Sequence, residues 1–191
     1  MTGKSALTLL MMALAANSAN AGHEHSLDGH HGGGQHAHVH GHAHMSLAQD
    51  GNTLWVEMRV PAFDLLGFER EAKDDGERAL INATVYQLRQ SQTLVKLPEA
   101  ANCELQKAAV ESPILEQDHS GHSHESHGHK GHADIEVSQQ FECQNPASLN
   151  AVEVALFNNY SRIERADIQW TLEGRQGSAR ATPAESQINL K

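Results

Sequence analysis

The chain has 191 residues, which is enough for one domain with a hydrophobic core but short for two. Its 14 lysines and arginines against 24 aspartates and glutamates give a formal net charge of −10 with histidine neutral. This balance disfavours nucleic acids and anionic membrane surfaces as partners, and it suits a protein that attracts cations.

Residues 1–21 have the pattern of a secretory signal peptide. Lys4 precedes an uncharged apolar run at 6–16, and small residues lead to Ala19-Asn20-Ala21, an Ala-x-Ala cleavage signal. A transmembrane anchor is the alternative, but the run is shorter than the ~20 apolar residues that a bilayer core requires. We therefore expect an exported protein that is not embedded in the membrane.

All fifteen histidines fall into two clusters. The first consists of His23, His25, His30, His31, His36, His38, His40, His42 and His44, and the second of His119, His122, His124, His127, His129 and His132. Histidine-rich tracts are typical of metal binding. An affinity tag is the alternative, but both tracts are irregular and one is internal. Residues 22–34 are mostly histidine and glycine, so we expect this segment to be disordered.

The chain changes character at residue 35, where histidine begins to alternate with small or apolar residues. A period of two predicts a strand over 36–47 with five imidazoles on one side. Asp50-Gly51 is a hairpin signal, and a second alternating segment follows it. Folding about this dipeptide pairs Leu47 with Leu54, Met45 with Val56 and Ala43 with Met58. The same register places Glu57 across from His44, which makes Glu57 a carboxylate candidate on the histidine face.

These residue types favour zinc, which takes nitrogen and oxygen ligands in tetrahedral sites. Copper and nickel remain alternatives, because imidazole binds them as well. A zinc hydrolase is the weaker interpretation, since no motif supplies a catalytic base beside a three-ligand site. The predicted Zn²⁺ ligands are His36, His38, His40, His42, His44, Glu57, His119, His122, His124, His127, His129 and His132.

The remaining segments predict one α+β domain over 35–191, with a mainly antiparallel sheet and one principal helix. Asp74 and Glu77 form a capping-box-like start for the helix. Its apolar stripe, which we expect to lie in the core, consists of Leu80, Ile81, Thr84, Val85 and Leu88.

Cys103 and Cys143 flank the second histidine cluster. Export favours a disulfide between them over a thiolate metal pair. The bridge would align strands 103–111 and 135–143 so that Leu105 faces Phe141 and Ala109 faces Val137. The histidine-rich insert 114–133 would then be a long hairpin loop.

The ordered set of motifs resembles the ZrgA family of periplasmic zinc-uptake proteins over nearly the whole mature chain. The resemblance rests on the histidine alternation at 38–45, Asp50-Gly51, Pro61-Ala62, Leu66-Gly67-Phe68-Glu69, the histidine-rich insert, His132-Ala133-Asp134 and Phe141-Glu142-Cys143. It implies a protein of the Gram-negative periplasm that binds zinc and aids an ABC-type zinc importer, with the importer's periplasmic binding protein as a partner. The chain departs from the family at Arg70, where a histidine is often found. A periplasmic buffer or resistance protein for copper, nickel or excess zinc is the alternative function.

Overall fold

The computed structural model describes residues 39–115 and 133–190, which lie in one compact unit that begins at residue 37. The predicted signal peptide, the predicted disordered segment 22–34 and the six histidines of the second cluster lie outside the described residues. The strands are β1 (His42–Asp50), β2 (Thr53–Pro61), β3 (Val95–Lys96), β4 (Cys103–Glu111), β5 (Asp134–Cys143), β6 (Ala151–Val154), β7 (Arg165–Leu172), β8 (Arg175–Ala181) and β9 (Gln187–Asn189). The helices are α1 (Ala62–Leu66) and α2 (Asp75–Leu88), with 3₁₀ turns η1 (Glu99–Ala101), η2 (Pro146–Ser148) and η3 (Leu156–Asn158).

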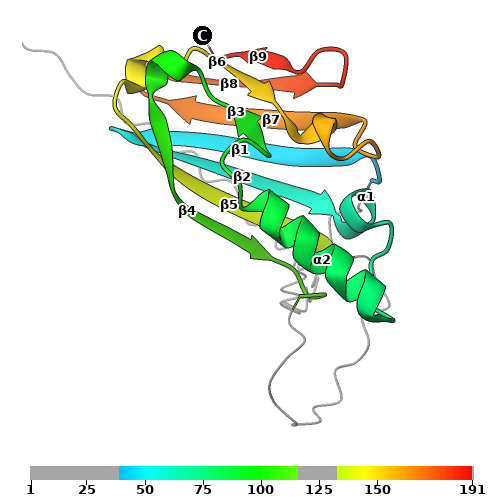
Figure 1. Ribbon diagram of the computed structural model, residues 1–191. Coiled ribbons are helices and arrows are strands. Elements are labelled where there is room, and N and C mark those ends of the chain that lie inside the picture. Colours follow the sequence, from blue (N-terminus) through cyan, green and yellow to red (C-terminus); the bar gives the residue numbers. More distant parts are fainter. Residues whose placement is uncertain (1–38, 116–132, 191) are drawn as a thin grey trace, which may run out of the picture. The chain divides into compact units, whose positions relative to one another are not determined.

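The main sheet has six strands in the order β4-β5-β2-β1-β7-β8, and β3, β6 and β9 form a small second sheet. Within the part of the chain that the structure describes, every strand pairing is antiparallel except that of β1 with β7. The prediction of an α+β fold with a mainly antiparallel sheet and one principal helix is therefore confirmed. Figure 1 shows α2 lying across β5 and β2, and the small sheet lying beside β7 and β8.

The first hairpin forms as expected, but its register differs by two residues from the prediction. Asp50 pairs with Thr53, so Gly51 and Asn52 are the loop residues, and Leu47 faces Val56 while Met45 faces Met58. A positive φ of 56° at Gly51 and none at Asn52 is the pattern of a type II′ turn. The shift is an even number, so the apolar residues still share one face.

A disulfide joins Cys103 to Cys143, which are paired directly across β4 and β5. The predicted bridge and the pairing of Leu105 with Phe141 are confirmed. Beyond Leu105 the prediction is wrong, because a bulge before Lys107 shifts the register by one residue. Val110 therefore faces Val137, and Ala109 faces Ser138.

Helix α2 covers the inner face of the main sheet, which is the face that carries its buried apolar residues. Ile81, Thr84 and Leu88 are buried, Val85 is partly buried, and Leu80 is exposed, which corrects its assignment to the core. The buried side chain of Gln139 on β5 donates to the carbonyls of Leu88 at 3.0 Å and Gln90 at 2.9 Å, so it satisfies the last carbonyl of the helix and one in the turn that follows it. Among the described residues, neither helix has the length and hydrophobicity that crossing a bilayer requires.

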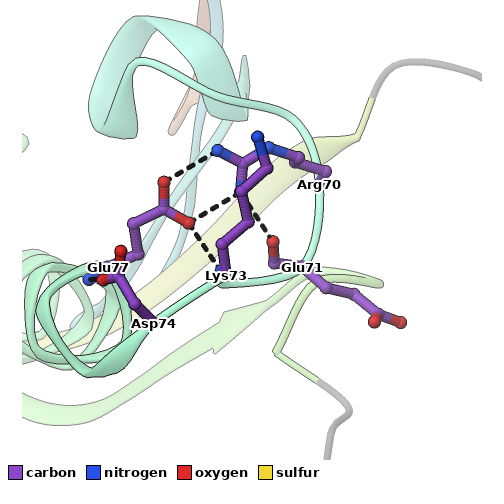
Figure 2. A network of polar contacts seen from close by, with 5 residues as sticks. All are labelled: Arg70, Glu71, Lys73, Asp74 and Glu77. Atoms are coloured by element: carbon purple, nitrogen blue, oxygen red, sulfur yellow. Dashed lines mark hydrogen bonds and ion pairs between the residues drawn. The ribbon is translucent and has the colours of Figure 1, made fainter.

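The start of α2 is held by the polar network of Figure 2. Asp74 is the N-cap, and its carboxylate accepts from the amide of Glu77 at 2.9 Å. Glu77 in turn accepts from the amide of Lys73 at 2.7 Å and from both terminal nitrogens of Arg70, at 2.6 and 2.7 Å. The guanidinium of Arg70 also lies over the ring of Phe68, 4.8 Å from its centroid. Arg70 is thus a structural partner of the helix start.

This network predicts a pH-dependent contribution to stability. The hydrogen bond from Arg70, helped by the amide of Lys73, lowers the pKa of Glu77 to about 2. A depressed carboxyl pKa stabilises the fold above the ordinary value and loses that effect as pH falls through the folded value. We expect Glu77→Gln to lower the melting temperature at neutral pH, with the difference from the wild type shrinking between about pH 4.5 and about pH 2. A difference that stays constant over this range would contradict the assignment.

Gly177 is required by the indole ring packed on it. It pairs with Trp170 across β7 and β8, and a Cβ at Gly177 would lie 2.4 Å from Cζ2 of that ring. The ring is rigid and Trp170 is 7% exposed, so it has little room to move. We expect Gly177→Ala to destabilise the fold by about 1–3 kcal/mol, as overpacked sites do. Urea denaturation measures this, and Ser178→Ala, at the exposed neighbouring position, should stay within about 0.5 kcal/mol of the wild type. Equal effects would show that the contact is unimportant.

Candidate metal-binding site

Gly41 is the corner at which the histidine-bearing segment joins the sheet. Its φ of 80° is in the left-handed region that favours glycine. Its amide donates to the carboxylate of Asp64 at 2.8 Å, and its carbonyl accepts from the amides of Glu164 at 2.8 Å and Arg165 at 3.0 Å. Asp64 is 1% exposed, and burial raises the pKa of its carboxyl group. The corner is therefore fixed from two sides.

This corner separates His40 from the strand, which corrects the predicted strand over 36–47. Strand β1 begins at His42, and His40 lies in the turn before it. The Nε2 atom of His40 is 2.9 Å from Oε1 of Glu69, and its ring stacks on Phe63 with centroids 4.8 Å apart and an interplanar angle of 16°. Arg162 lies over the same Phe63 ring at 5.7 Å. The imidazole is thus held in one orientation beside a carboxylate.

The separation of His40 and Glu69 suits a shared zinc ion. Two atoms that each lie ~2.0–2.1 Å from a tetrahedral ion are about 3.3 Å apart. The observed 2.9 Å needs only a small widening for an ion to take the place of the shared hydrogen. The Glu69 side chain is only 13% exposed whereas that of His40 is 46% exposed, so the pair combines a largely buried carboxylate with a more exposed imidazole. The two side chains could supply two of the four ligands of a tetrahedral site.

The outer face of the main sheet carries the other described histidines. His42 and His44 point to this face of β1, and the pairing register places one row of polar residues across all six strands. The row reads Glu111, Glu136, Arg59, His44, Asp167 and Arg180 from β4 to β8. His44 therefore has Arg59 on one side and Asp167 on the other.

The charges around this row affect the histidines and Asp167 differently. Burial lowers the pKa of His42, and the nearby charge of Arg165 lowers it further, which favours the neutral imidazole that metals require. Asp167 accepts from Nε of Arg180 at 2.8 Å through Oδ1, and its Oδ2 is 3.7 Å from Arg165. The hydrogen bond from Arg180 lowers the pKa of Asp167. Both oxygens of this carboxylate thus face arginines.

Glu57 lies on the histidine face as predicted, but it is not opposite a histidine. It pairs with Ser46, whose hydroxyl donates to Oε2 at 3.1 Å. Glu57, Glu111, Glu136 and Asp167 line a shallow open hollow of about 630 Å³ together with His44 and Arg59. The two-residue change in register thus removes Glu57 from direct contact with His44 and leaves it in the wall of this hollow.

The described histidines need further ligands to complete a site. Within 39–115 and 133–190, no three histidine, cysteine or carboxylate side chains converge closely enough to hold a metal ion. Among the predicted ligands the structure thus places His40, His42, His44 and Glu57. The others lie outside the described residues and stay predictions: His36, His38, His119, His122, His124, His127, His129 and His132.

The two histidine-rich segments join the described domain close to these residues. Val39 directly precedes His40, and the insert ends at Ala133, whose carbonyl accepts from the amide of Ala62 at 2.7 Å. Ala62 is the neighbour of Phe63, on which His40 stacks. Ile114 and Ala133 are buried, so the ends of the predicted insert belong to the core.

Sequence reasoning missed Glu69 and Asp167. Glu69 comes beside His40 only because α1 turns the chain back, and Gly67 closes that helix with a φ of 86°. The Leu-Gly-Phe-Glu motif was a visible signal for Glu69, since glycine is common just after a helix end. Asp167 comes beside His44 through the parallel pairing of β1 with β7, for which no local signal exists.

The comparisons with known proteins agree with a zinc-related role. A comparison with curated proteins found no match. A comparison with protein families matched residues 37–190 to the description ZrgA family zinc uptake protein. The match spans the whole described domain and most of the chain. The chain therefore belongs to the ZrgA family of zinc uptake proteins.

Proposed function

We propose that this protein captures Zn²⁺ in the periplasm on its histidine-rich segments and supports uptake by an ABC-type zinc importer. The observation that carries the proposal is the His40–Glu69 pair at the corner where the first histidine cluster enters the domain. Membership of a zinc uptake family supports the metal and the direction of transport. The signal-peptide pattern and the disulfide support an exported location.

The role is binding and transfer, with no chemical turnover. The weak sites on the two histidine-rich segments collect zinc, and the His40–Glu69 pair holds it more tightly. Ligands that are free to move lose conformational entropy on binding, whereas ligands already held in place do not. The insert ends at Ala133, whose carbonyl accepts a hydrogen bond from the amide of Ala62, the residue before Phe63. The end of the insert is therefore close to the ring on which His40 stacks. Tethering of this kind raises the effective concentration of captured zinc at the fixed pair.

A metal buffer or resistance protein is the second candidate, since imidazole also binds copper and nickel. The conditions that induce expression distinguish an uptake protein from a resistance protein. An uptake protein is induced by zinc starvation, and its loss slows growth in zinc-depleted medium. A resistance protein is induced by excess metal, and its loss sensitises cells to copper, nickel or zinc.

The fixed pair predicts the effect of removing its carboxylate. We expect Glu69→Gln to weaken the tightest zinc affinity of the mature protein by roughly tenfold or more, because a neutral amide is a poor zinc ligand and a poor partner for a ligating imidazole. Isothermal calorimetry measures this. Glu71→Gln, at an exposed carboxylate two residues away, is the matched control and should leave the affinity unchanged. An unchanged affinity in the Glu69 variant would remove the pair from the site.

The insert predicts a separate effect on the amount of zinc bound. We expect replacement of its six histidines by serine, which preserves the chain length and the buried Ile114 and Ala133, to lower the number of bound ions more than the tightest affinity. Calorimetry and metal analysis after dialysis measure both quantities. Loss of the tightest site with the insert histidines would contradict this division, and absence of zinc binding by the unaltered protein would refute the proposed function itself.

A further inference from the structure

We propose that Asp167 is a reserve zinc ligand for His42 and His44, and that Arg180 sets the zinc affinity of this outer-face site by occupying that carboxylate. The inference rests on the zinc-binding function proposed above and extends it to residues that no sequence motif marks. It concerns a second site, on the other side of the Gly41 corner from His40 and Glu69.

The strand pairing places three possible zinc donors at neighbouring positions on one face of the sheet. His44 and Asp167 are direct partners on the neighbouring strands β1 and β7, with side chains on the same face. Adjacent strands are ~4.8 Å apart, and residues two apart on one strand are about 6.6 Å apart. His42 lies two residues before His44 on the same face, so two imidazoles and one carboxylate occupy adjacent positions of the outer face, although the three do not converge in the described structure. This is a ligand set that zinc takes.

The observed ion pairs explain why these donors do not already converge. Arg180 binds Oδ1 of Asp167 at 2.8 Å, and Arg165 lies 3.7 Å from Oδ2, so both oxygens are directed to arginines and not to the histidines. Arg180 lies on the edge strand β8, and its side chain is 60% exposed. An exposed ion pair on an edge strand contributes little stability, so an incoming cation can displace it.

Displacement of Arg180 has a functional consequence. A zinc ion that must first break the Arg180–Asp167 pair is held less tightly than the same three ligands would hold it alone. Three protein ligands also leave a fourth position open, through which an incoming ligand from another protein can attack. The outer-face site therefore suits release of zinc, whereas the His40–Glu69 pair, on its aromatic platform, suits retention.

The other charges that face the site set the controls. Arg59 is the partner of His44 on the neighbouring strand β2, but no hydrogen bond or ion pair joins it to Asp167 among the contacts described. Removing Arg59 therefore reports the general effect of one positive charge. Lys96, which pairs with Glu153 at 2.8 Å in the small sheet, reports the loss of a comparable ion pair elsewhere.

The test uses the full mature protein with ¹⁵N-labelled histidine, in chelator buffers that fix free zinc. The imidazole nitrogen signals of His44, assigned by their loss in His44→Gln, report occupancy of this site alone. We expect Arg180→Gln to shift half-saturation to about tenfold lower free zinc, the scale on which partners of metal ligands change affinity. Arg59→Gln should give a clearly smaller shift, and Lys96→Gln none. Asp167→Asn should raise the free zinc needed for half-saturation. Adding Arg180→Gln to that variant should shift half-saturation by no more than Arg59→Gln does in the wild type.

Two results would overturn the proposal. One is an Arg180→Gln variant whose half-saturation shifts no more than that of Arg59→Gln, or shifts by the same factor when Asp167→Asn is also present. Either outcome would show a charge effect without ligation by Asp167. The other is a His44 signal that does not respond to zinc while calorimetry still detects the Glu69-dependent site. In both cases the zinc-capture function stands, because only the absence of all zinc binding would refute that function.

Discussion

The hydrogen bonds of Gly41 determine which way the described histidines His40, His42 and His44 face. Its left-handed φ turns the chain between His40 and His42, and the bonds to Asp64, Glu164 and Arg165 hold the turn in place. Without this turn the alternation would continue, and His40 would join His42 and His44 on one face. With it, His40 lies on Phe63 beside Glu69 while the other two face the outer side of the sheet. The burial of a carboxylate at Asp64 is the cost of this arrangement, since desolvation disfavours its charged form. The hydrogen bond from the amide of Gly41 offsets part of this effect, and the nearby side chains of His40 and Arg162 act in the same direction.

Local sequence patterns predicted the helices and strands of this domain well. They failed where two strand registers leave the same residues on the same face of the sheet. The alternation of apolar residues in β1 and β2 is satisfied equally by registers that differ by two, so the apolar pairs chosen from sequence could not distinguish them. The turn decided the register, because Gly51 takes the first loop position of a type II′ hairpin. The pairing of Leu105 with Phe141 was predictable because the disulfide fixes it from the adjacent residues. The bulge that follows had no signal in the sequence.

The sequence allowed the histidines of the candidate site to be predicted, but not the carboxylates that lie beside them. Histidine clusters indicate imidazole as the candidate ligand, but the carboxylates beside the described histidines come from pairings between segments far apart in the chain. Asp167 lies 123 positions after His44 and reaches it through the single parallel pair of the main sheet. Glu69 needed α1 and the glycine after it to turn back on His40. Glu57 was chosen for its nearness in the hairpin, and the change of register gave its place opposite His44 to Arg59.

At the position after Glu69, where the resemblance in sequence implies that a histidine is often found, this chain has Arg70. A histidine there would stand beside Glu69 and could extend the ligand set. Arg70 is instead bound by Glu77 through two hydrogen bonds and stacked on Phe68, which commits its side chain to the start of α2. A guanidinium remains protonated at any physiological pH, so it cannot donate a lone pair to zinc. Under the proposed function, the remaining ligands of the His40–Glu69 pair are then expected from the histidines that precede it in the chain, His36 and His38. Capture by these histidines and retention at the pair would in that case be one step, whereas the insert histidines would add to the amount of zinc bound.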